Sequence, residues 1–284
     1  TVNISELNDW LLSEDKQPLI MGILNVTPDS FTDGGKFLDT NTAVNHAMDM
    51  IADGADIIDI GGESTRPFSD PVSEEEELSR VISVIQKLRE KTDAIISIDT
   101  TKSSVADNAC SVGADIVNDI SGLSFDSNMI DTVIKHDCPV ILMHIIGNPK
   151  TMQENPSYNN LISDITNHLL DRANFALKKG VKKHNIILDP GIGFGKTIDN
   201  NFTIINNIDK LTDLGYPILI GASRKSFIGK TLNVDENNRI EGTIASNIIA
   251  LDRGCKIFRV HDIIEAKKSL IIGNKILNSN TLNT

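Results

Sequence analysis

Eight short apolar runs alternate along the chain with longer segments in which apolar residues recur at helical spacing. Short runs rich in Ile, Leu and Val are typical of strands buried on both faces of a parallel sheet. Apolar residues three and four positions apart predict amphipathic helices. The eight runs lie at residues 18–26, 55–64, 94–100, 114–120, 139–145, 185–191, 217–223 and 255–261. The alternation therefore predicts a series of βα units.

The segments between the runs predict one helix after each strand. These helices are expected at residues 41–54, 73–92, 102–112, 127–137, 159–180, 201–214, 240–253 and 262–277. Gly113, Gly180, Gly215 and Gly254 mark the ends of four of them, as is common at helix C-termini. Ahead of the first run, residues 4–14 predict a short amphipathic helix that plugs or flanks the bottom of the fold.

This repeat predicts an α/β fold, namely a single (βα)8 TIM barrel preceded by a short N-terminal helix. No low-complexity linker or composition shift divides the chain. We therefore assign residues 1–17 to an N-terminal extension and residues 18–284 to one catalytic barrel. An open doubly wound sheet is the alternative fold. In a closed parallel barrel the C-terminal ends of all strands meet at one rim, so the polar residues that end the runs would converge into an active site.

Three of the predicted βα loops are long and rich in Gly, Pro, Ser and Asp, at residues 27–39, 64–73 and 225–238. All three belong to the same predicted rim. Loops that overhang the C-terminal end of a barrel commonly serve as lids over the chemistry. We expect these three to cover the active site.

The composition argues against several classes of function. A net charge of −12 disfavours nucleic acid and anionic membrane surfaces as partners. No stretch reaches the roughly 18–20 apolar residues of a membrane span, and no signal-peptide pattern opens the chain. The three cysteines are widely spaced and show no metal-ligand spacing, which favours reduced thiols and a cytoplasmic location.

Eight sequence strings in a fixed order carry a resemblance to a known family. They are MGILNVTPDSFTDGG, DIGGESTRP, SIDTTKSS, IVNDISG, TMQ, LDPGIGFGK, GASRKSFIG and FRVHD, between residues 21 and 262. With this ordered set the chain closely resembles dihydropteroate synthases, sulfonamide-targeted (βα)8 barrels of the folate pathway. The resemblance implies condensation of 6-hydroxymethyl-7,8-dihydropterin diphosphate with p-aminobenzoate, assisted by Mg²⁺. It also implies a homodimer formed through the later helices.

The resemblance assigns pterin binding to Asp99, Asn118, Asp189, Phe194 and Lys225. A buried carboxylate suits the adjacent N–H donors of a pterin edge, and such a polar site discriminates strongly against analogues that lack them. The structural alternatives stay open. Asp99 could cap the helix that follows it, and Asn118 and Asp189 could shape turns.

Diphosphate binding is assigned by the same resemblance to Asn25, Arg66, Arg259 and His261, with Asn25 also the expected Mg²⁺ ligand. Arginine suits phosphate because its planar fork binds two oxygens together. Mg²⁺ keeps several waters and seldom needs a full protein cage, so one amide and the substrate's phosphates suffice. As alternatives, Arg259 could be a surface cation at a strand end, and His261 could have no ligand role.

The p-aminobenzoate positions implied by the resemblance are Phe31, Thr65, Pro67 and Ser226. Ser226 would hold the carboxylate with its backbone N–H and hydroxyl at a helix N-terminus. No side chain is placed as a covalent nucleophile. Catalysis then depends on Asp99, Lys225, Arg259 and His261, which stabilise the departing diphosphate and the cation left on the pterin.

Three positions depart from the family pattern, and two other functions compete. Ile145 and Ile146 follow His144 where the family usually has Met-Gln, and Phe68 replaces a small residue. We interpret His144 as structural. A catalytically silent pterin-binding barrel and a pterin-dependent methyl transfer barrel are the competing functions. Neither requires all of the strings that this chain retains.

Overall fold

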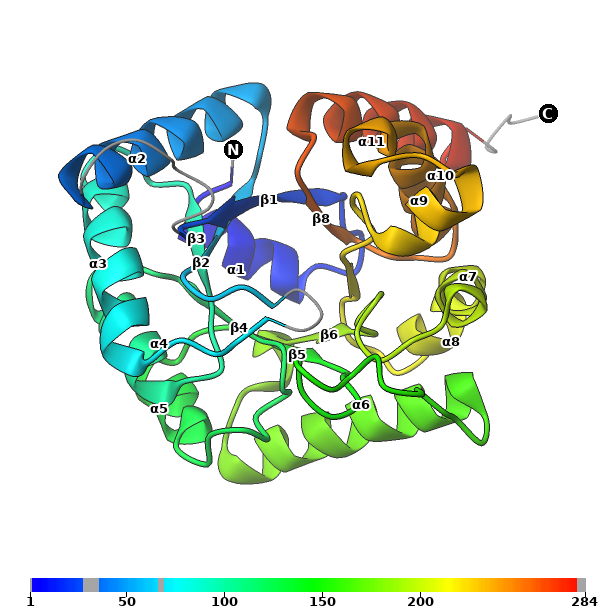
Figure 1. Ribbon diagram of the computed structural model, residues 1–284, viewed down its shortest axis with the longest axis horizontal. Helices are drawn as coiled ribbons and strands as arrows, with labels where there is room; N and C mark the ends of the chain where they lie inside the picture. The colour runs from blue at the N-terminus through cyan, green and yellow to red at the C-terminus, as the bar shows by residue number, and fades with distance from the viewer. Residues whose placement is uncertain (1, 28–35, 66–68, 280–284) are drawn as a thin grey trace.

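Eight parallel strands form one sheet in the order β6-β5-β4-β3-β2-β1-β8-β7. The computed structural model describes residues 2–27, 36–65 and 69–279. Figure 1 shows the strands at the centre and the helices around them. The strands are β1 (Leu19–Asn25), β2 (Ile57–Gly61), β3 (Ile95–Asp99), β4 (Ile116–Asp119), β5 (Val140–Met143), β6 (Ile186–Asp189), β7 (Leu219–Ile220) and β8 (Ile257–Val260).

Closure of the sheet occurs between β6 and the short β7. Leu188 and Ile218 form a parallel bridge there, and the Leu188 N–H donates to the carbonyl of Pro217 at 3.0 Å. Every other neighbouring pair runs parallel in continuous register. The (βα)8 barrel is therefore confirmed, and the open doubly wound sheet is wrong.

The helices that cover the strands agree with the predicted positions except between residues 201 and 238. They are α2 (Lys36–Asp53), α3 (Glu74–Arg89), α4 (Ser103–Ser111), α5 (Met129–His136), α6 (Leu161–Lys179), α7 (Ile198–Asn206), α8 (Ile208–Thr212), α9 (Ser226–Leu232), α10 (Ile240–Asp252) and α11 (Ile263–Leu277). Short 3₁₀ helices add η2 (Lys183–Asn185) and η3 (Glu236–Asn238). The four glycines predicted to end helices all have positive φ.

Two local predictions were wrong. The expected helix at 201–214 is split into α7 and α8 at Asn207, whose φ of −122° and ψ of 26° are not helical. The expected lid at 225–238 contains α9 and η3 rather than a continuous loop. Its short helix begins at Ser226, with Lys225 as the N-cap, and Arg224 before them has a φ of 55°.

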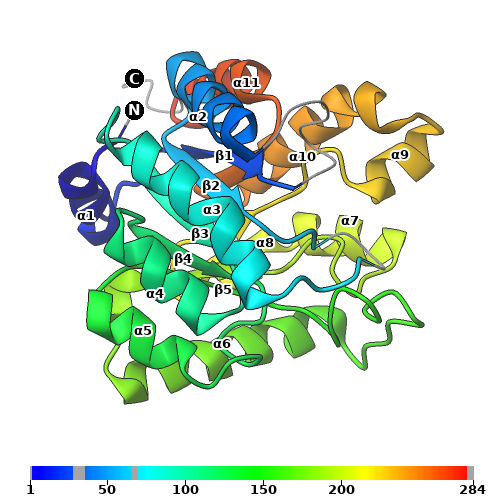
Figure 2. The same ribbon diagram turned by 60° about the vertical axis from the view of Figure 1, so that its left-hand side comes forward.

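The predicted N-terminal helix, α1 (Ile4–Leu12), plugs the bottom of the barrel. An Asn3–Glu6 capping box starts it. Its Leu7, Trp10 and Leu11 pack into one buried cluster with residues from all eight strands. Figure 2 shows α1 at one end of the molecule and α9 at the other. The bottom is thus filled with apolar side chains, and the opposite end remains for a site.

None of the helices in the described ranges is long and apolar enough to span a membrane. The predicted boundary between residues 17 and 18 lies in the segment that joins α1 to β1. All three cysteines are free thiols.

Candidate active site

All five residues assigned to the pterin line one cavity at the C-terminal ends of the strands. Strand register explains the convergence, because Asp99 pairs with Asn118 across β3 and β4, and Met143 pairs with Asp189 across β5 and β6. The cavity is lined by Thr65, Asp99, Asn118, Ile120, Met143, Asp189, Ile192, Phe194, Gly221, Lys225 and Arg259. Residues up to 194 positions apart in the sequence are therefore brought together by the barrel alone.

A buried carboxylate beneath this cavity was missed by the sequence analysis. Asp59 lies in the middle of β2 with no exposed surface. Its Oδ2 accepts the Arg259 Nε–H at 2.6 Å and the Asn118 Nδ2–H at 3.1 Å. The available signal was a charged residue inside an otherwise apolar run, since a buried charge in a strand requires a partner.

Arg259 joins two carboxylates rather than standing alone at a strand end. Besides Asp59, its Nη2–H donates to Asp99 Oδ2 at 2.9 Å. The side chain is 19% exposed, so the alternative of a bland surface cation is wrong. Two of its three guanidinium nitrogens are thus engaged inside the barrel. The residue orients Asp59 and Asp99 before any substrate enters.

Both carboxylates that face the cavity are strongly perturbed. Burial, reinforced by the neighbouring charge of Asp59, raises the pKa of Asp99 to about 7, although Arg259 acts in the opposite direction. Burial raises the pKa of Asp189 to about 6, against the charges of Lys225, Lys196 and Arg259. Perturbed acids gathered in one cavity are typical of functional sites.

The structural alternatives for Asp99 and Asp189 have different outcomes. Lys102, not Asp99, is the N-cap residue of α4, and that helix start has no side-chain cap bond, so the capping role is wrong. Asp189 does shape a turn, because its Oδ1 accepts the Gly191 N–H at 2.7 Å. It lines the cavity as well. Asn118 lies within β4, while the turn that follows is held by Asp119.

Lys225 forms one wall of the cavity together with Phe194. Its Nζ lies 4.3 Å from the centroid of the Phe194 ring, a cation–π contact. The preceding residue, Arg224, has a left-handed backbone with a φ of 55° and pairs with Asp262. Left-handed backbone at a non-glycine residue costs energy and concentrates at functional sites. This turn is what aims Lys225 toward Asp189 rather than continuing β7.

A second cavity of about 280 Å³ adjoins the first and shares Thr65, Asp99 and Ile120 with it. The remaining lining comes from the segments after β2, β3, β4 and β5. These residues are Glu63, Ser69, Pro71, Glu77, Thr100, Thr101, Lys102, Phe125, Asn148, Pro149 and Lys150. The mouth of the barrel therefore holds two adjoining cavities.

His261 follows β8 and is bound to the segment after β7. Its Nδ1 lies 3.0 Å from Ser223 Oγ, and its backbone N–H donates to the same oxygen at 3.2 Å. Burial, with the charges of Arg259 and Arg224, lowers the pKa of His261 to about 4. A neutral imidazole at pH 7 can donate one hydrogen bond but supplies no charge.

The structure describes only some of the other residues that were predicted to contact the substrates. Asn25 is exposed at the end of β1, Thr65 is half-buried and lines both cavities, and Ser226 is exposed as the first residue of α9. Ser226 does not line the first cavity, although it follows Lys225 directly. Phe31, Arg66, Pro67 and the variant Phe68 lie outside the described residues.

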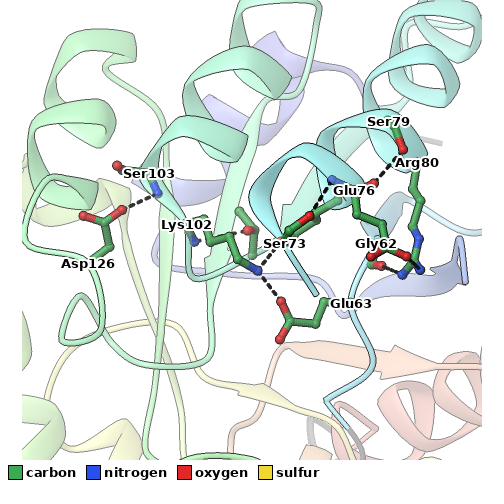
Figure 3. A network of polar contacts seen from close by, with 11 residues as sticks. Gly62, Glu63, Ser73, Glu76, Ser79, Arg80, Lys102, Ser103 and Asp126 are labelled. Atoms are coloured by element: carbon green, nitrogen blue, oxygen red, sulfur yellow. Dashed lines mark hydrogen bonds and ion pairs between the residues drawn. The ribbon is translucent and has the colours of Figure 1, made fainter. Parts of the chain in front are cut away.

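An ion-pair network holds the segment that leaves β2 (Figure 3). Lys102 pairs with Glu63 after β2 and, at 2.6 Å, with the fully buried Glu77 of α3. Arg80 of the same helix donates to the carbonyl of Gly62 at 2.5 Å. The segment leading to Thr65 is therefore fixed at its base from α3 and from the start of α4.

The described residues contain no group of three or more His, Cys, Asp or Glu side chains that could hold a metal ion. Asn25 can contribute one amide oxygen, a ligand type that suits Mg²⁺. This chain therefore fits a Mg²⁺ ion whose other ligands are water and substrate phosphate oxygens. Within the described ranges, no set of side chains fits a metal caged by protein alone.

Comparison with known proteins places these features in a family. The profile of the pterin binding enzyme family matches residues 21–261. A dihydropteroate synthase of Clostridium beijerinckii is 50% identical over 251 residues, covering 88% of this chain and 91% of that protein.

Two solved structures have the same fold over most of their length. One is a dihydropteroate synthase from Clostridium difficile in the presence of pteroic acid, with a TM-score of 0.87, 46% identity, and coverage of 92% of this chain and 97% of that one. The other is a Yersinia pestis dihydropteroate synthase in complex with a sulfonamide drug, with a TM-score of 0.87, 40% identity, and coverage of 92% and 94%.

Proposed function

The chain belongs to the dihydropteroate synthase family of pterin binding enzymes, and we propose from this premise how its barrel mouth performs the reaction. It is a transferase of folate biosynthesis that joins 6-hydroxymethyl-7,8-dihydropterin diphosphate to p-aminobenzoate. The products are 7,8-dihydropteroate and diphosphate. The observation that carries the residue assignment is the convergence of Asp99, Asn118, Asp189 and Lys225 on one cavity.

Pterin recognition is assigned to the buried polar residues of the first cavity. Asp189 accepts two neighbouring N–H groups of the amino-pyrimidinone edge, since Lys225, Lys196 and Arg259 favour its ionised form. Asn118 uses its Nδ2–H on Asp59, which leaves its carbonyl oxygen for the ligand. Asp99 faces the remaining ring nitrogens, and Phe194 with Lys225 covers the ring and its carbonyl.

Diphosphate release is assigned to the residues around Asn25 and His261, with Arg66 supplying charge from the segment after β2. His261 acts as a neutral donor, consistent with its lowered pKa of about 4. Arg259 contributes mainly by its field, because Asp59 and Asp99 occupy two of its nitrogens. Asn25 would hold Mg²⁺ together with the substrate's phosphates, and the bound ion would supply Lewis acidity toward the leaving group.

The chemical step needs no covalent enzyme intermediate. The carbon–oxygen bond breaks with its electron pair leaving on diphosphate, and the exocyclic methylene becomes cationic. Asp99 and Asp189 stabilise that charge, which spreads into the pterin ring. The aniline nitrogen of p-aminobenzoate attacks the methylene and then loses a proton to solvent. Thr65, Ser226, Phe31 and Pro67 orient the aminobenzoate.

Release of diphosphate tests this function directly. The protein is mixed with the pterin diphosphate and Mg²⁺, with and without p-aminobenzoate, and both products are quantified. Release coupled to dihydropteroate formation supports the synthase assignment. Tight pterin binding without release would instead favour the catalytically silent pterin-binding barrel.

We also propose a homodimer formed through the later helices. Five isoleucines on α10 and α11 are exposed, namely Ile249, Ile264, Ile271, Ile272 and Ile276. Exposed apolar patches often mark protein interfaces. Sedimentation of the wild-type chain beside Ile272→Glu tests this, because a monomeric wild type would refute it.

A cytoplasmic location and the absence of nucleic-acid and membrane partners stay predictions.

A further inference from the structure

Lys196 is a buried cation outside the lining of the pterin cavity, and the mechanism above uses it only through its charge near Asp189. Lys196 is only 3% exposed. The described residues provide no carboxylate within ion-pair distance of its Nζ. Instead, Nζ lies 3.0 Å from His144 Nδ1, 2.8 Å from the carbonyl oxygen of Phe194 and 3.4 Å from that of His144. Because a buried ammonium is costly, three acceptors arranged around it indicate a specific use.

The protonation states of this pair follow from its surroundings. Burial, with the charges of Lys196 and His168, lowers the pKa of His144 to about 2, so its ring is neutral. A neutral ring whose Nδ1 accepts from Lys196 carries its proton on Nε2. Burial lowers the pKa of Lys196 to about 7, although the charge of Asp189 raises it. The cation therefore persists only with help from Asp189.

Lys196 also fastens the loop that carries Phe194, residues 190–196, to the end of β5. Gly191 has a φ of 70°, and a Cβ there would lie 2.1 Å from the carbonyl oxygen of His144. Two side chains after β5 add contacts, with Gln153 Nε2 donating to the Gly193 carbonyl at 2.5 Å and the Tyr158 hydroxyl to that of Gly195 at 2.7 Å. The loop thus rests directly on the backbone below it.

The front of the same loop reaches the cavity. Phe194 packs against the buried cluster that contains Met143, Ile145 and Met152, and its ring meets Lys225. A displacement of the Phe194 carbonyl would therefore move the wall of the cavity. The positive charge of Lys196 acts on Asp189 from the protein side, while Lys225 and Arg259 act on it from β7 and β8.

We propose that Lys196, held by His144, is a positioning residue for the pterin that fixes the 190–196 loop and keeps a positive charge behind Asp189. The proposal rests on the proposed function, because it assigns a role to residues behind that pterin site. It also gives His144 a purpose beyond the purely structural one predicted from the sequence.

The first test compares Lys196→Met with the wild type in binding 6-hydroxymethyl-7,8-dihydropterin by calorimetry. We expect Kd to rise roughly 10- to 100-fold, the range for loss of one charged hydrogen-bonding group. The KM for p-aminobenzoate, measured at saturating pterin diphosphate, should change less than about twofold. The variant displaces the loop that carries Phe194 but leaves the residues that contact p-aminobenzoate in place. Lys196→Arg, which keeps the charge, should recover part of the affinity.

The pH profile provides a readout that a merely structural lysine would not change. The charged and titratable groups around Asp189 are Lys196 on its own loop, Lys225 after β7, and Cys255 and Arg259 near β8. Removing the Lys196 charge leaves the pKa of Asp189 higher. The acid limb of pterin affinity should therefore move to higher pH in Lys196→Met. An unmoved limb, or equal losses for both substrates, would overturn the proposal.

A second pair of variants keeps the test decisive if Lys196→Met does not fold. His144→Asn retains an acceptor for Lys196 and should bind the pterin nearly as the wild type does, whereas His144→Leu should bind it more weakly. Arg89→Met removes a cation at the other end of the barrel, paired with Asp115, and should leave Kd unchanged. If the wild type makes no dihydropteroate, the proposed function fails. If it does and the Lys196 and His144 variants all bind normally, only this inference fails.

Discussion

The two ends of the barrel are built from the same strands but fill their interior in opposite ways. At the bottom, Ile57, Ile95 and Ile116 pack against α1 with no exposed surface. Within β3, the same inward face continues from Ile95 through Ser97 to Asp99. The bottom thus gains stability by burying apolar area. The mouth buries charged and polar groups instead. The free-energy cost of burying them is offset only in part, because Asp59 Oδ1 and Ser97 Oγ have no protein partner.

This difference teaches where stability and function are separated in the chain. Burial perturbs the charged groups at the mouth, their partners offset part of that cost, and a ligand completes their hydrogen bonds. Enzymes commonly retain such destabilised groups because activity requires them. Substitutions at the mouth should therefore change activity with little loss of stability, and substitutions at the bottom should do the reverse.

The largest expected effect is on activity at the mouth. Asp189→Asn replaces the carboxylate with a neutral amide that has only one acceptor oxygen for the N–H groups of the pterin edge. The kcat/KM should therefore fall about a thousandfold. Stability at pH 7 should rise by up to about 3 kcal/mol, because a pKa raised from 3.8 to about 6 reflects a destabilised charge. Coupled product assays and urea unfolding measure the two quantities.

Asp115→Asn provides the matched control at the other end of the strands. Asp115 accepts from Arg89 and from the Ile96 N–H near the bottom of the barrel. Its loss should leave kcat/KM within about twofold, since it lies far from the reacting groups. Equal losses of activity in the two variants would refute the separation of the ends.

The next effect is on stability at the bottom. Ile95→Ala removes a fully buried side chain from the cluster around α1. The free energy of unfolding should fall by about 2–5 kcal/mol, as for other buried large-to-small changes. The kcat/KM of the folded fraction should stay close to that of the wild type. Leu12→Ala, at a site that is 65% exposed, serves as the control and should barely change unfolding.

Lowering the pH should raise the stability of the folded chain through two carboxyl groups and should weaken pterin binding. Asp99 and Asp189 have pKa values of about 7 and about 6 in the folded chain, above the ordinary 3.8. The folded state therefore holds protons that the unfolded state has released between about pH 4 and about pH 7, so these two groups reduce stability as the pH rises through that window. Pterin affinity should rise over its upper part, because the ligand needs ionised carboxylates.

Comparison with the Asp99→Asn, Asp189→Asn double variant measures this contribution. The variant should gain stability relative to the wild type as the pH rises from about 4 to about 7, and the difference should then level off. A constant difference across the window would mean that neither carboxyl group has a raised pKa in the folded state.

The sequence predicted what depends on periodicity and missed what depends on register. The apolar alternation was enough for the barrel, for α1 and for the convergence of Asp99, Asn118 and Asp189, because strand ends meet whatever fills the interior. Asp59 and Lys196 were missed as partners, since their contacts join strands and loops whose relative height only the folded structure sets.

Local geometry also limited the prediction of helices. The start of α9 depends on the left-handed Arg224, a conformation that glycine rather than arginine would have signalled. The break at Asn207 separates α7 from α8 within an otherwise helical pattern. Asn does lower helix propensity, but a single such residue is too weak a signal to end a helix.

The smallest expected effect concerns an exposed ion pair on the rim of the mouth. Lys150 Nζ lies 2.8 Å from Asp70 Oδ1, and the two side chains are 62% and 81% exposed. Water screens such pairs, so Lys150→Gln should leave the thermal midpoint unchanged and kcat/KM within about twofold. Both are measured beside Asp189→Asn under the same conditions. If Lys150→Gln lowered kcat/KM as strongly as Asp189→Asn does, location at the mouth rather than burial would determine which residues activity depends on. Because burial raises the pKa of Asp99 and of Asp189 in the cavity, we expect burial to decide it.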